Sequence, residues 1–491
     1  MDYLRKNKII RPKNKITMKK ILLFLACTCM IHLLPAQGRQ QEKTDSVCIL
    51  VKKYFNEKNP AKIYGLTGEA FRKELSPEAF KTVCDNNLFP LGEMNKTEFE
   101  NQAGGVSTYK TVIGSANLSL LLSLDQNDKI EVFLFKPYSD ATAKKNYIVP
   151  SINPMATALD KEVDSAVQSY ISLQATVGLS IGVLKDGKVF FYGYGETARG
   201  NKQIPNEHTL FEIGSISKTF TSILLADAVN SGKVKLDDPM SKYLPDSIPR
   251  LQFDGIPITL KTLANHSSGI PRMPSNFYSS DNSNPYKDYD RKDLFSFYRN
   301  FKPIRKPGEK YEYSNLAAAT LGVILESVDH EKYETLLIST ICRPLHMNET
   351  REFLLAGDSV RFAKGYSEDG AFSSQWDFRA LGAAGCIRST SADLLKYARA
   401  NLGDAPPALD KAIQLTHVIT FTEAQTKVGL AWHFIKLGKD EVIFHNGQTG
   451  GYHSYLAFNT EKKFAVVILS NCAKGTEEIG NTVMKWLENN Q

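Results

Sequence analysis

Apolar positions in the first part of the chain recur at helical spacing and then alternate with polar ones. Val47, Leu50, Val51 and Tyr54 form one helical face, and a second helical region runs from Ala70 to Val83. Alternation predicts strands over residues 106–113, 116–124 and 129–137, with Asn127-Asp128 as a hairpin turn. We therefore expect residues 45–138 to form a small α+β domain.

A Pro-containing linker, residues 139–154, precedes a second pattern. A helical face over residues 159–171 is followed by strand-like segments at 177–184 and 189–195 around the turn Asp186-Gly187. The chain ends with strand-like segments at 455–458 and 464–469 and a last amphipathic helix. Between them the pattern is largely helical, with a polar, Tyr- and Pro-rich loop predicted over residues 275–310. We expect residues 155–491 to form one antiparallel sheet from both ends of the domain, a helical lobe between them, and a site in the cleft.

One helix in this middle region carries candidate chemistry at its start. Its apolar stripe includes Phe220 and Leu224, and Ser231-Gly232 ends it. Ser215 and Lys218 lie three residues apart on the first turn, so their side chains leave the same face. The amine, the free backbone N–H groups and the helix dipole all favour a developing alkoxide at Ser215. Ser215 is therefore a candidate activated nucleophile.

The charge of the chain is concentrated at its amino terminus. The formal net charge is +7, and residues 1–36 hold eight Lys or Arg residues against Asp2 alone, so the remainder is formally neutral. This distribution gives no electrostatic support for nucleic-acid binding. Basic residues, a short apolar core and Pro35-Ala36 are typical of a cleavable signal peptide, which predicts a periplasmic or secreted protein. Met18 is an alternative start to Met1, and lipoprotein processing at Cys27 is the competing interpretation, the only one that would anchor the chain to a membrane.

Five cysteines remain beyond the predicted signal peptide, without metal-ligand spacing. Their number and spacing do not indicate a disulfide-stabilised fold. Cys48 and Cys84 could form one disulfide within the first domain, or both could be buried free thiols. We expect no metal and no organic cofactor. His266, in an Asn-His-Ser-Ser-Gly turn, is interpreted as structural. His453 lies at an even spacing from His445, which would put both on one face of a sheet.

The short motifs at Ser215 and Tyr313 are not specific by themselves, because each also occurs elsewhere in the chain. The predicted secondary structure around each occurrence distinguishes them. Ser-x-x-Lys also occurs at Ser107, within a predicted strand whose positions i and i+3 point to opposite faces. Tyr-x-Asn also occurs at Tyr54 and Tyr298. Only Ser215 stands at a helix start, and only Tyr313 stands on a loop that ends at a core helix.

Five motifs in order give a resemblance over about residues 155–490. Ser215-Ile-Ser-Lys218, Tyr313-Ser-Asn315 and His445-Asn-Gly447 resemble the three motifs of the serine β-lactamase and penicillin-binding protein superfamily. The class C β-lactamase, carboxypeptidase, D-aminopeptidase and esterase branch is the most similar. Residues 263–271 and 381–385 resemble further motifs of that family. The resemblance implies a β-lactamase/transpeptidase-like α+β fold, and the first domain resembles nuclear-transport-factor or cystatin-like domains.

The resemblance also implies roles for the site residues. Ser215 would form an acyl-enzyme, and Lys218 would take its proton or hold Tyr313 ready to do so. Tyr313 would protonate the leaving group and later activate water. Asn315 would donate to the substrate, and the backbone N–H groups of Ser215 and Gln448 would form the oxyanion hole.

His445 departs from the family pattern, because β-lactamases and most penicillin-binding proteins carry a lysine there for a substrate carboxylate. A histidine is mostly neutral at pH 7. The chain is therefore interpreted as an exported serine hydrolase for small amides, D-amino-acid peptides or esters, with peptidoglycan-derived peptides among the candidates. The alternatives are a true β-lactamase or penicillin-binding carboxypeptidase, and a non-catalytic protein that binds cell-wall peptide.

Overall fold

The computed structural model describes residues 41–103, 105–138, 143–281 and 283–490, and the chain divides into two compact units before and after residue 140. The predicted signal peptide and Cys27 lie outside the described residues. Within the described ranges, no helix is both long enough and apolar enough to cross a membrane.

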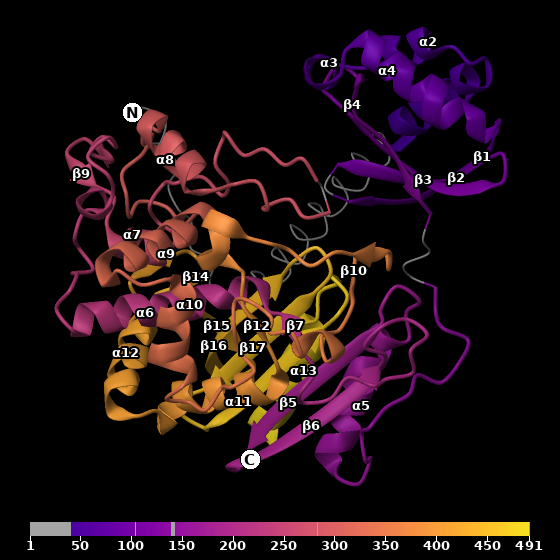
Figure 1. The fold of residues 1–491 in the computed structure, drawn as a ribbon. Helices are drawn as coiled ribbons and strands as arrows, with labels where there is room; N and C mark the ends of the chain where they lie inside the picture. Colours follow the sequence, from indigo (N-terminus) through magenta and orange to yellow (C-terminus); the bar gives the residue numbers. More distant parts are fainter. Residues whose placement is uncertain (1–40, 104, 139–142, 282, 491) are drawn as a thin grey trace, which may run out of the picture. The chain divides into compact units, whose positions relative to one another are not determined.

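The first unit is a set of helices and a four-stranded antiparallel sheet (Figure 1). Residues 41–56 are helical, and α2 (Pro60–Gly65), α3 (Glu69–Glu74) and α4 (Pro77–Val83) follow. The sheet has the order β1 (Met94–Ala103), β2 (Val106–Ile113), β3 (Ala116–Leu124) and β4 (Ile130–Pro137). Cys48 and Cys84 are buried free thiols, which settles the alternative between pairing and free thiols.

The structure confirms the three predicted strands of this unit but corrects two other features. The helical region from Ala70 to Val83 is interrupted, because Ser76 caps a new helix and Pro77 occupies its first turn. Strand β1 was not predicted, since this edge strand carries mostly exposed polar residues and lacks the alternation that marks a half-buried strand.

The second unit is built on an eight-stranded antiparallel sheet, as expected. Its order is β13 (Phe421–Glu423), β14 (Thr426–Val428), β15 (His433–Leu437), β16 (Asp440–Gln448), β17 (His453–Asn459), β18 (Phe464–Ser470), β5 (Gly178–Lys185) and β6 (Lys188–Gly195). The register pairs Ala465 with Leu184 and Ser470 with Leu179, so the last strand of the chain lies beside the first strand of the unit. The two ends of this unit therefore form one sheet.

Each face of the sheet packs against its own helices. Along β18, Val466 and Ile468 belong to a core with α5 (Ala158–Ile171) and α13 (Glu477–Asn489), whereas Val467 and Leu469 belong to the core of the helical lobe. Figure 1 shows this lobe, whose helices are α6 (Ser217–Asn230), α7 (Leu260–Ala264), α8 (Arg291–Asn300), α9 (Asn315–Asp329), α10 (Tyr333–Leu336), α11 (Ser391–Arg399) and α12 (Pro407–His417). Helix α8 lies inside the region predicted as a loop, and a capping box between Asp290 and Asp293 starts it.

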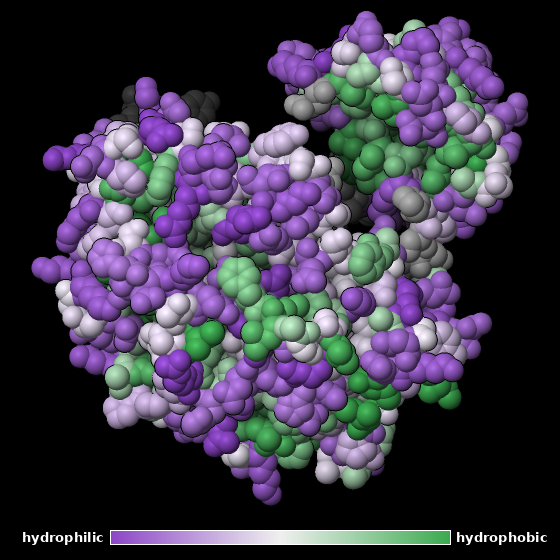
Figure 2. Space-filling model, viewed as in Figure 1, coloured by the Kyte–Doolittle hydropathy of each residue, from purple (hydrophilic) through white to green (hydrophobic). Residues whose placement is uncertain are grey.

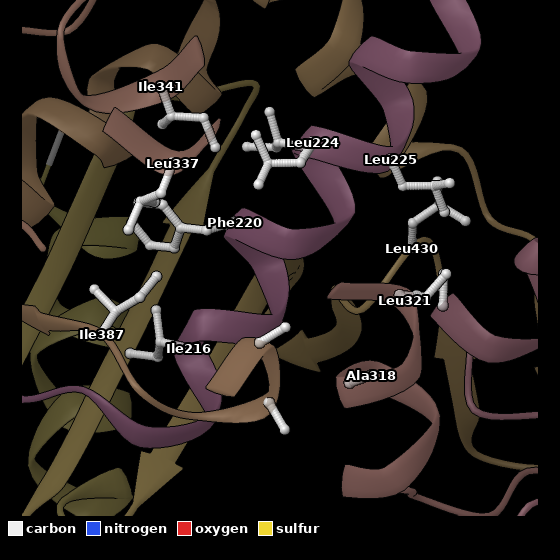
Figure 3. Close-up of a cluster of buried hydrophobic side chains, with 14 of the residues drawn as sticks. Ile216, Phe220, Leu224, Leu225, Ala318, Leu321, Leu337, Ile341, Ile387 and Leu430 are labelled. Atoms are coloured by element: carbon white, nitrogen blue, oxygen red, sulfur yellow. The ribbon is translucent and has the colours of Figure 1, made fainter. Parts of the chain in front are cut away.

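Helix α6 is buried on nearly all sides rather than along one stripe. Its polar residues Thr219 and Thr221 are buried as well, and their hydroxyls donate to the backbone carbonyls of Ile216 and Ser217. Phe220 lies among Ile216, Leu337, Ile341 and Ile387 (Figure 3) and stacks on Tyr397 with ring centroids 4.0 Å apart. This packing fixes the helix that begins beside Ser215.

Truncating Phe220 tests this anchoring. We expect Phe220→Ala to lower the free energy of unfolding by about 3–5 kcal/mol, because it removes a fully buried ring and leaves a cavity. The three tryptophans, Trp376, Trp432 and Trp486, all lie in the second unit, so their fluorescence during urea titration reports on that unit. Phe372→Ala is the control, since Phe372 is 66% exposed. Equal shifts in the two variants would contradict this account of the core.

Candidate active site

Ser215 lies in a short turn that joins the sheet to α6. Gly214–Ile216 form a 3-10 turn directly before α6. The Ser454 hydroxyl on β17 donates to the Ile213 carbonyl at 2.8 Å, and the Ile213 backbone N–H donates to the Ile387 carbonyl at 3.0 Å. The turn is thus tied to the sheet and to the lobe, which holds the Ser215 hydroxyl in place.

Lys218 is buried directly beside this hydroxyl. Its Nζ lies 2.8 Å from Ser215 Oγ and donates to the Ala384 carbonyl at 2.7 Å, and the residue is 1% exposed. Burial, and then the positive charge of Arg272, holds the pKa of Lys218 well below its usual value. Burial therefore favours the neutral amine, whose lone pair can accept the Ser215 proton.

Tyr313 approaches Ser215 from the other side, on the loop before α9. Burial raises the pKa of Tyr313, and a hydrogen bond with the Ser215 side chain and the charge of Arg272 partly offset that rise. The Lys218 Nζ lies 4.9 Å from the ring centroid of Tyr313. Ser215, Lys218 and Tyr313 therefore meet at one point, where burial favours the neutral forms of both the amine and the phenol.

His266 fixes the loop that carries Tyr313. Its Nδ1 accepts from the Ser314 backbone N–H at 3.2 Å, and its ring lies 4.5 Å from the Tyr313 ring, centroid to centroid. Burial lowers the pKa of His266 well below its usual value, so the ring is neutral. His266 thus has a structural role, as expected, and that role includes direct contact of its imidazole with the Tyr313 ring. The sequence separates the two residues by 47 positions and gives no signal for their contact.

Asn315 begins α9 and lines the same cavity. Its backbone N–H donates to the Arg272 carbonyl at 3.1 Å, and its side-chain amide lies 3.9 Å from Met273 Sδ. The preceding Ser314 caps the helix by accepting from the Ala317 backbone N–H at 2.9 Å. The amide of Asn315 therefore stands at a fixed helix start beside Ser215.

The third motif closes the opposite side, at the end of β16. His445, Gly447 and Gln448 are on this strand, and the motif lies at its carboxyl end. His445 is 1% exposed, and its Nδ1–H donates to the Asn446 carbonyl at 2.5 Å, which leaves Nε2 buried without a hydrogen-bond partner. Burial, and then the neighbouring His433 and Lys218, lowers the pKa of His445 well below its usual value. This position therefore supplies no positive charge at pH 7.

His453 does not share a face with His445, contrary to the expectation from even spacing. The two residues belong to adjacent strands, and the register pairs His445 with Leu456, so His453 points the other way. Its Nδ1 lies 2.9 Å from Thr476 Oγ1, and its Nε2 lies 3.1 Å from a carboxylate oxygen of Glu477 on α13. The chain reversal between β16 and β17 changes the alternation, which spacing alone could not reveal.

Two glycines allow the turn at Ser215 to lie against the end of β16. A Cβ on Gly447 would come within 2.0 Å of the Ile213 carbonyl oxygen and 2.8 Å of the Ser215 backbone nitrogen. A Cβ on Gly214, whose φ is +49°, would come within 2.7 Å of the Gln448 backbone nitrogen. This close approach brings together the two backbone amides expected to form the oxyanion hole.

A cavity of about 430 Å³ opens at Ser215. Its lining includes the expected Tyr313, Asn315, Gly447 and Gln448, and three residues that the sequence did not single out: Arg272, Tyr286 and Trp376. Tyr286 comes from the polar, Tyr- and Pro-rich region that was predicted as a loop over residues 275–310. Nowhere in the described residues do three or more His, Cys, Asp or Glu side chains form a group that could bind a metal ion.

Comparison with known proteins concerns the second unit. A family model described as Beta-lactamase matches residues 163–485. A Beta-lactamase of Pseudomonas fluorescens is 30% identical over 354 residues, which cover 64% of this chain and 94% of that protein. The D-alanyl-D-alanine-carboxypeptidase/endopeptidase AmpH of Escherichia coli (strain K12) is 29% identical over 307 residues, covering 60% of this chain and 78% of that protein.

Solved structures of proteins with the same descriptions are also similar to this chain. A class C beta-lactamase is similar with a TM-score of 0.61 and 26% sequence identity, covering 68% of this chain and 97% of that chain. A D-alanine carboxypeptidase AmpC from Burkholderia cenocepacia is similar with a TM-score of 0.59 and 26% identity, covering 67% of this chain and 99% of that chain. Both likenesses extend over nearly the whole of the compared chains.

Gly447→Ala tests the junction between β16 and the Ser215 turn. The new methyl group would push against the Ile213 carbonyl and the Ser215 amide, and we expect about a 100-fold or greater loss of kcat on an activated ester. Gly357→Ala is the matched control, since no atom lies within 4 Å of the added Cβ. Circular dichroism and tryptophan fluorescence check that both variants fold. Full activity in folded Gly447→Ala would contradict the proposed geometry of the junction.

The protonation state of Lys218 predicts the pH dependence. Because its pKa is lowered, the neutral amine is the form present above that lowered pKa and is lost as pH falls through it. We expect kcat/KM for an uncharged ester to fall on acidification and to level off well below pH 10.5. Lys218→Arg, which stays protonated, should lose about 10²- to 10⁴-fold at every pH. A wild-type profile still rising toward pH 10.5 would show an unperturbed lysine and contradict the prediction.

Proposed function

Because the chain belongs to the serine β-lactamase family and is a serine hydrolase that acts through an acyl-enzyme, we propose that its substrates are esters, small amides and D-amino-acid peptides. This membership confirms the resemblance drawn from the motifs. The observation that carries the substrate proposal is His445, which is buried and neutral at the position where the family's β-lactamases hold a lysine. Without a cation there, that wall offers no ion pair to a β-lactam carboxylate.

The proposed mechanism uses the three groups that meet at Ser215. Neutral Lys218 accepts the Ser215 proton as Oγ attacks the substrate carbonyl, forming the new C–O bond. The backbone N–H groups of Ser215 and Gln448 donate to the oxyanion, and Asn315 donates to the substrate. Tyr313 passes a proton to the leaving alcohol or amine, which departs and leaves the acyl-enzyme. Water, deprotonated by the same groups, then attacks the acyl carbon, releases the acid and returns the proton to Ser215.

The names of two relatives point to β-lactams and D-alanyl-D-alanine peptides as further candidate substrates. One is named a Beta-lactamase and another a D-alanyl-D-alanine-carboxypeptidase/endopeptidase. β-Lactam hydrolysis and removal of a terminal D-alanine are therefore the activities to compare with ester hydrolysis. The same serine chemistry serves all three, so the difference lies in how the cavity binds each substrate.

We also propose that the protein is exported. The support is the basic, then apolar, then small-residue pattern at the amino terminus, which is typical of a signal peptide. Peptides derived from the cell wall would then be accessible substrates. Expression of the full chain in a bacterial host, followed by fractionation and amino-terminal sequencing of the mature protein, checks this proposal. A mature chain that retains residues 1–36 and stays in the cytoplasm would contradict it.

Covalent labelling tests the nucleophile. We expect a fluorescent fluorophosphonate to label the wild-type protein at Ser215, as peptide mass mapping would show, because the neutral Lys218 activates that hydroxyl. Ser215→Ala should not be labelled, and Ser107→Ala, which alters the motif recurring in the first unit, should be labelled like the wild type. Retained labelling of Ser215→Ala would assign the reaction to another residue, and absence of any adduct would favour a binding protein over an enzyme.

Turnover then decides among the substrates. With one enzyme preparation, we expect kcat/KM for a short-chain p-nitrophenyl ester to exceed that for nitrocefin by at least about tenfold, the ratio that corresponds to loss of the one charge contact that a lysine at the His445 position of the β16 wall would make with the β-lactam carboxylate. A D-Ala-D-Ala peptide assayed for released D-alanine tests the peptidase activity. Faster turnover of nitrocefin than of the ester would overturn the esterase and peptidase preference while leaving the acyl-enzyme mechanism intact.

A further inference from the structure

The cavity at Ser215 contains one charged side chain that the proposed mechanism does not use. Its ten lining residues are serine, tyrosine, tryptophan, asparagine, glycine, glutamine and threonine, with Arg272 as the single charged one among them. Arg272 follows Pro271, at the end of the segment that begins with His266. This arginine therefore determines the sign of the charge that the cavity presents to a substrate.

The backbone of Arg272 is held firmly, while its guanidinium is exposed. The Arg272 carbonyl accepts from the backbone N–H groups of Asn315 at 3.1 Å and Leu316 at 3.2 Å, which ties it to the start of α9. Its Cζ lies 5.1 Å from the centroid of the Tyr313 ring. The side chain is thus directed to the same place as the reacting groups by a fixed backbone.

No anion neutralises this guanidinium among the described residues. It makes no hydrogen bond or ion pair there, and its charge shifts the pKa values of Lys218, His266, Tyr286, Tyr311 and Tyr313. At neutral pH none of these five is an anion. The nearby loop carboxylate of Glu312 pairs instead with Arg305, at 2.6 Å. Arg272 therefore retains all five N–H donors for a ligand.

An aromatic wall forms another part of the same entrance. Tyr286 stacks on Phe378 with ring centroids 4.9 Å apart and meets Trp376 edge-on at 5.0 Å. Tyr286 and Trp376 line the cavity with Arg272, and Phe378 lines the adjoining hollow at Ser215. Figure 2 shows hydrophilic and hydrophobic side chains interspersed on the visible face of the molecule. The cavity thus combines an apolar surface with one unpaired cation.

The geometry points to Arg272 as the residue that selects substrates carrying a carboxylate, with an apolar portion of the same substrate against Tyr286 and Trp376. The planar guanidinium can donate two parallel hydrogen bonds to a carboxylate. The anion then lies on the wall formed by the helical lobe, beside Tyr313, and not on the β16 wall where His445 is neutral. This inference rests on the proposed ester or peptide hydrolysis at Ser215 and specifies its substrate class as anionic.

A competing role for Arg272 is to act on Tyr313 alone. Its positive charge favours the phenolate form of Tyr313 and could raise the rate for every substrate equally. The two roles differ in one measurable respect. Tuning of Tyr313 changes the rate irrespective of substrate charge, whereas recognition of a carboxylate changes the ratio between anionic and uncharged substrates.

The experiment measures that ratio in the full chain. Three p-nitrophenyl esters of equal length carry a terminal carboxylate, a methyl group or a trimethylammonium group on the acyl side. Phenyl acetate and its 3-carboxyphenyl counterpart place the charge on the leaving-group side. We expect Arg272→Gln to lower the anionic-to-uncharged ratio of kcat/KM by about tenfold on at least one side, the loss of one charge-assisted contact. Arg272→Lys should retain part of the ratio, and Arg272→Glu should favour the trimethylammonium ester.

Controls separate this inference from the proposed function. Arg250→Gln removes an exposed arginine outside the cavity and should leave the ratio unchanged. Calorimetric binding of the anionic and uncharged esters to Ser215→Ala, with and without Arg272→Gln, reports on Arg272 without turnover. If the wild type neither hydrolyses esters nor labels at Ser215, the proposed hydrolysis fails while this binding comparison still decides the role of Arg272. Ratios and binding preferences that stay within twofold in all Arg272 variants, or rates that fall equally for all charges, would overturn the inference.

Discussion

Burying the amine of Lys218 is unfavourable for its charged form, and much of the second unit serves to keep that amine buried, which favours its neutral form. The surrounding core excludes water, the Ala384 carbonyl accepts one N–H, and the Ser215 hydroxyl lies 2.8 Å from the nitrogen. An exposed lysine at the same spacing would stay protonated at pH 7 and could not take a proton from serine. Helix α6 therefore has to be buried on nearly all sides, and the helical lobe has to pack around it.

The sheet supplies the second constraint, because the oxyanion site depends on where β16 ends. Gly447 lets the strand end touch the Ile213 carbonyl and the Ser215 amide, and Gly214 does the same from the turn. Ser454 of the neighbouring strand holds that turn by a hydrogen bond to Ile213. The candidate nucleophile Ser215 is thus positioned by two strands near the carboxyl end of the chain, although it lies more than 200 residues before them.

Neutral histidines and one arginine set the charge around the cavity. His266 and His445 lie against the Tyr313 ring, and His433 lies against His445; burial lowers the pKa of each histidine, so all three are neutral at pH 7. Their neutrality favours a low-charge interior in which a proton can pass between Ser215, Lys218 and Tyr313 without a competing cation. Arg272, exposed at the entrance, then carries the positive charge of this site, where a substrate can reach it.

Local pattern was sufficient to predict seven of the twelve strands in the two large sheets, the two-ended sheet and the candidates Ser215, Lys218 and Tyr313, because alternation, helix starts and short motifs depend on neighbours in sequence. It failed where distant segments decide the outcome. The turn between β16 and β17 places His453 on the opposite face of the sheet from His445. The polar segment β1 forms a strand because it pairs with β2 at the edge of its sheet. The contacts of His266 with Ser314, and the cavity shared by Arg272, Tyr286 and Trp376, join segments separated by tens of residues. The sequence alone thus determined which groups can do the chemistry, and the tertiary structure decided their protonation and their neighbours, since both depend on burial.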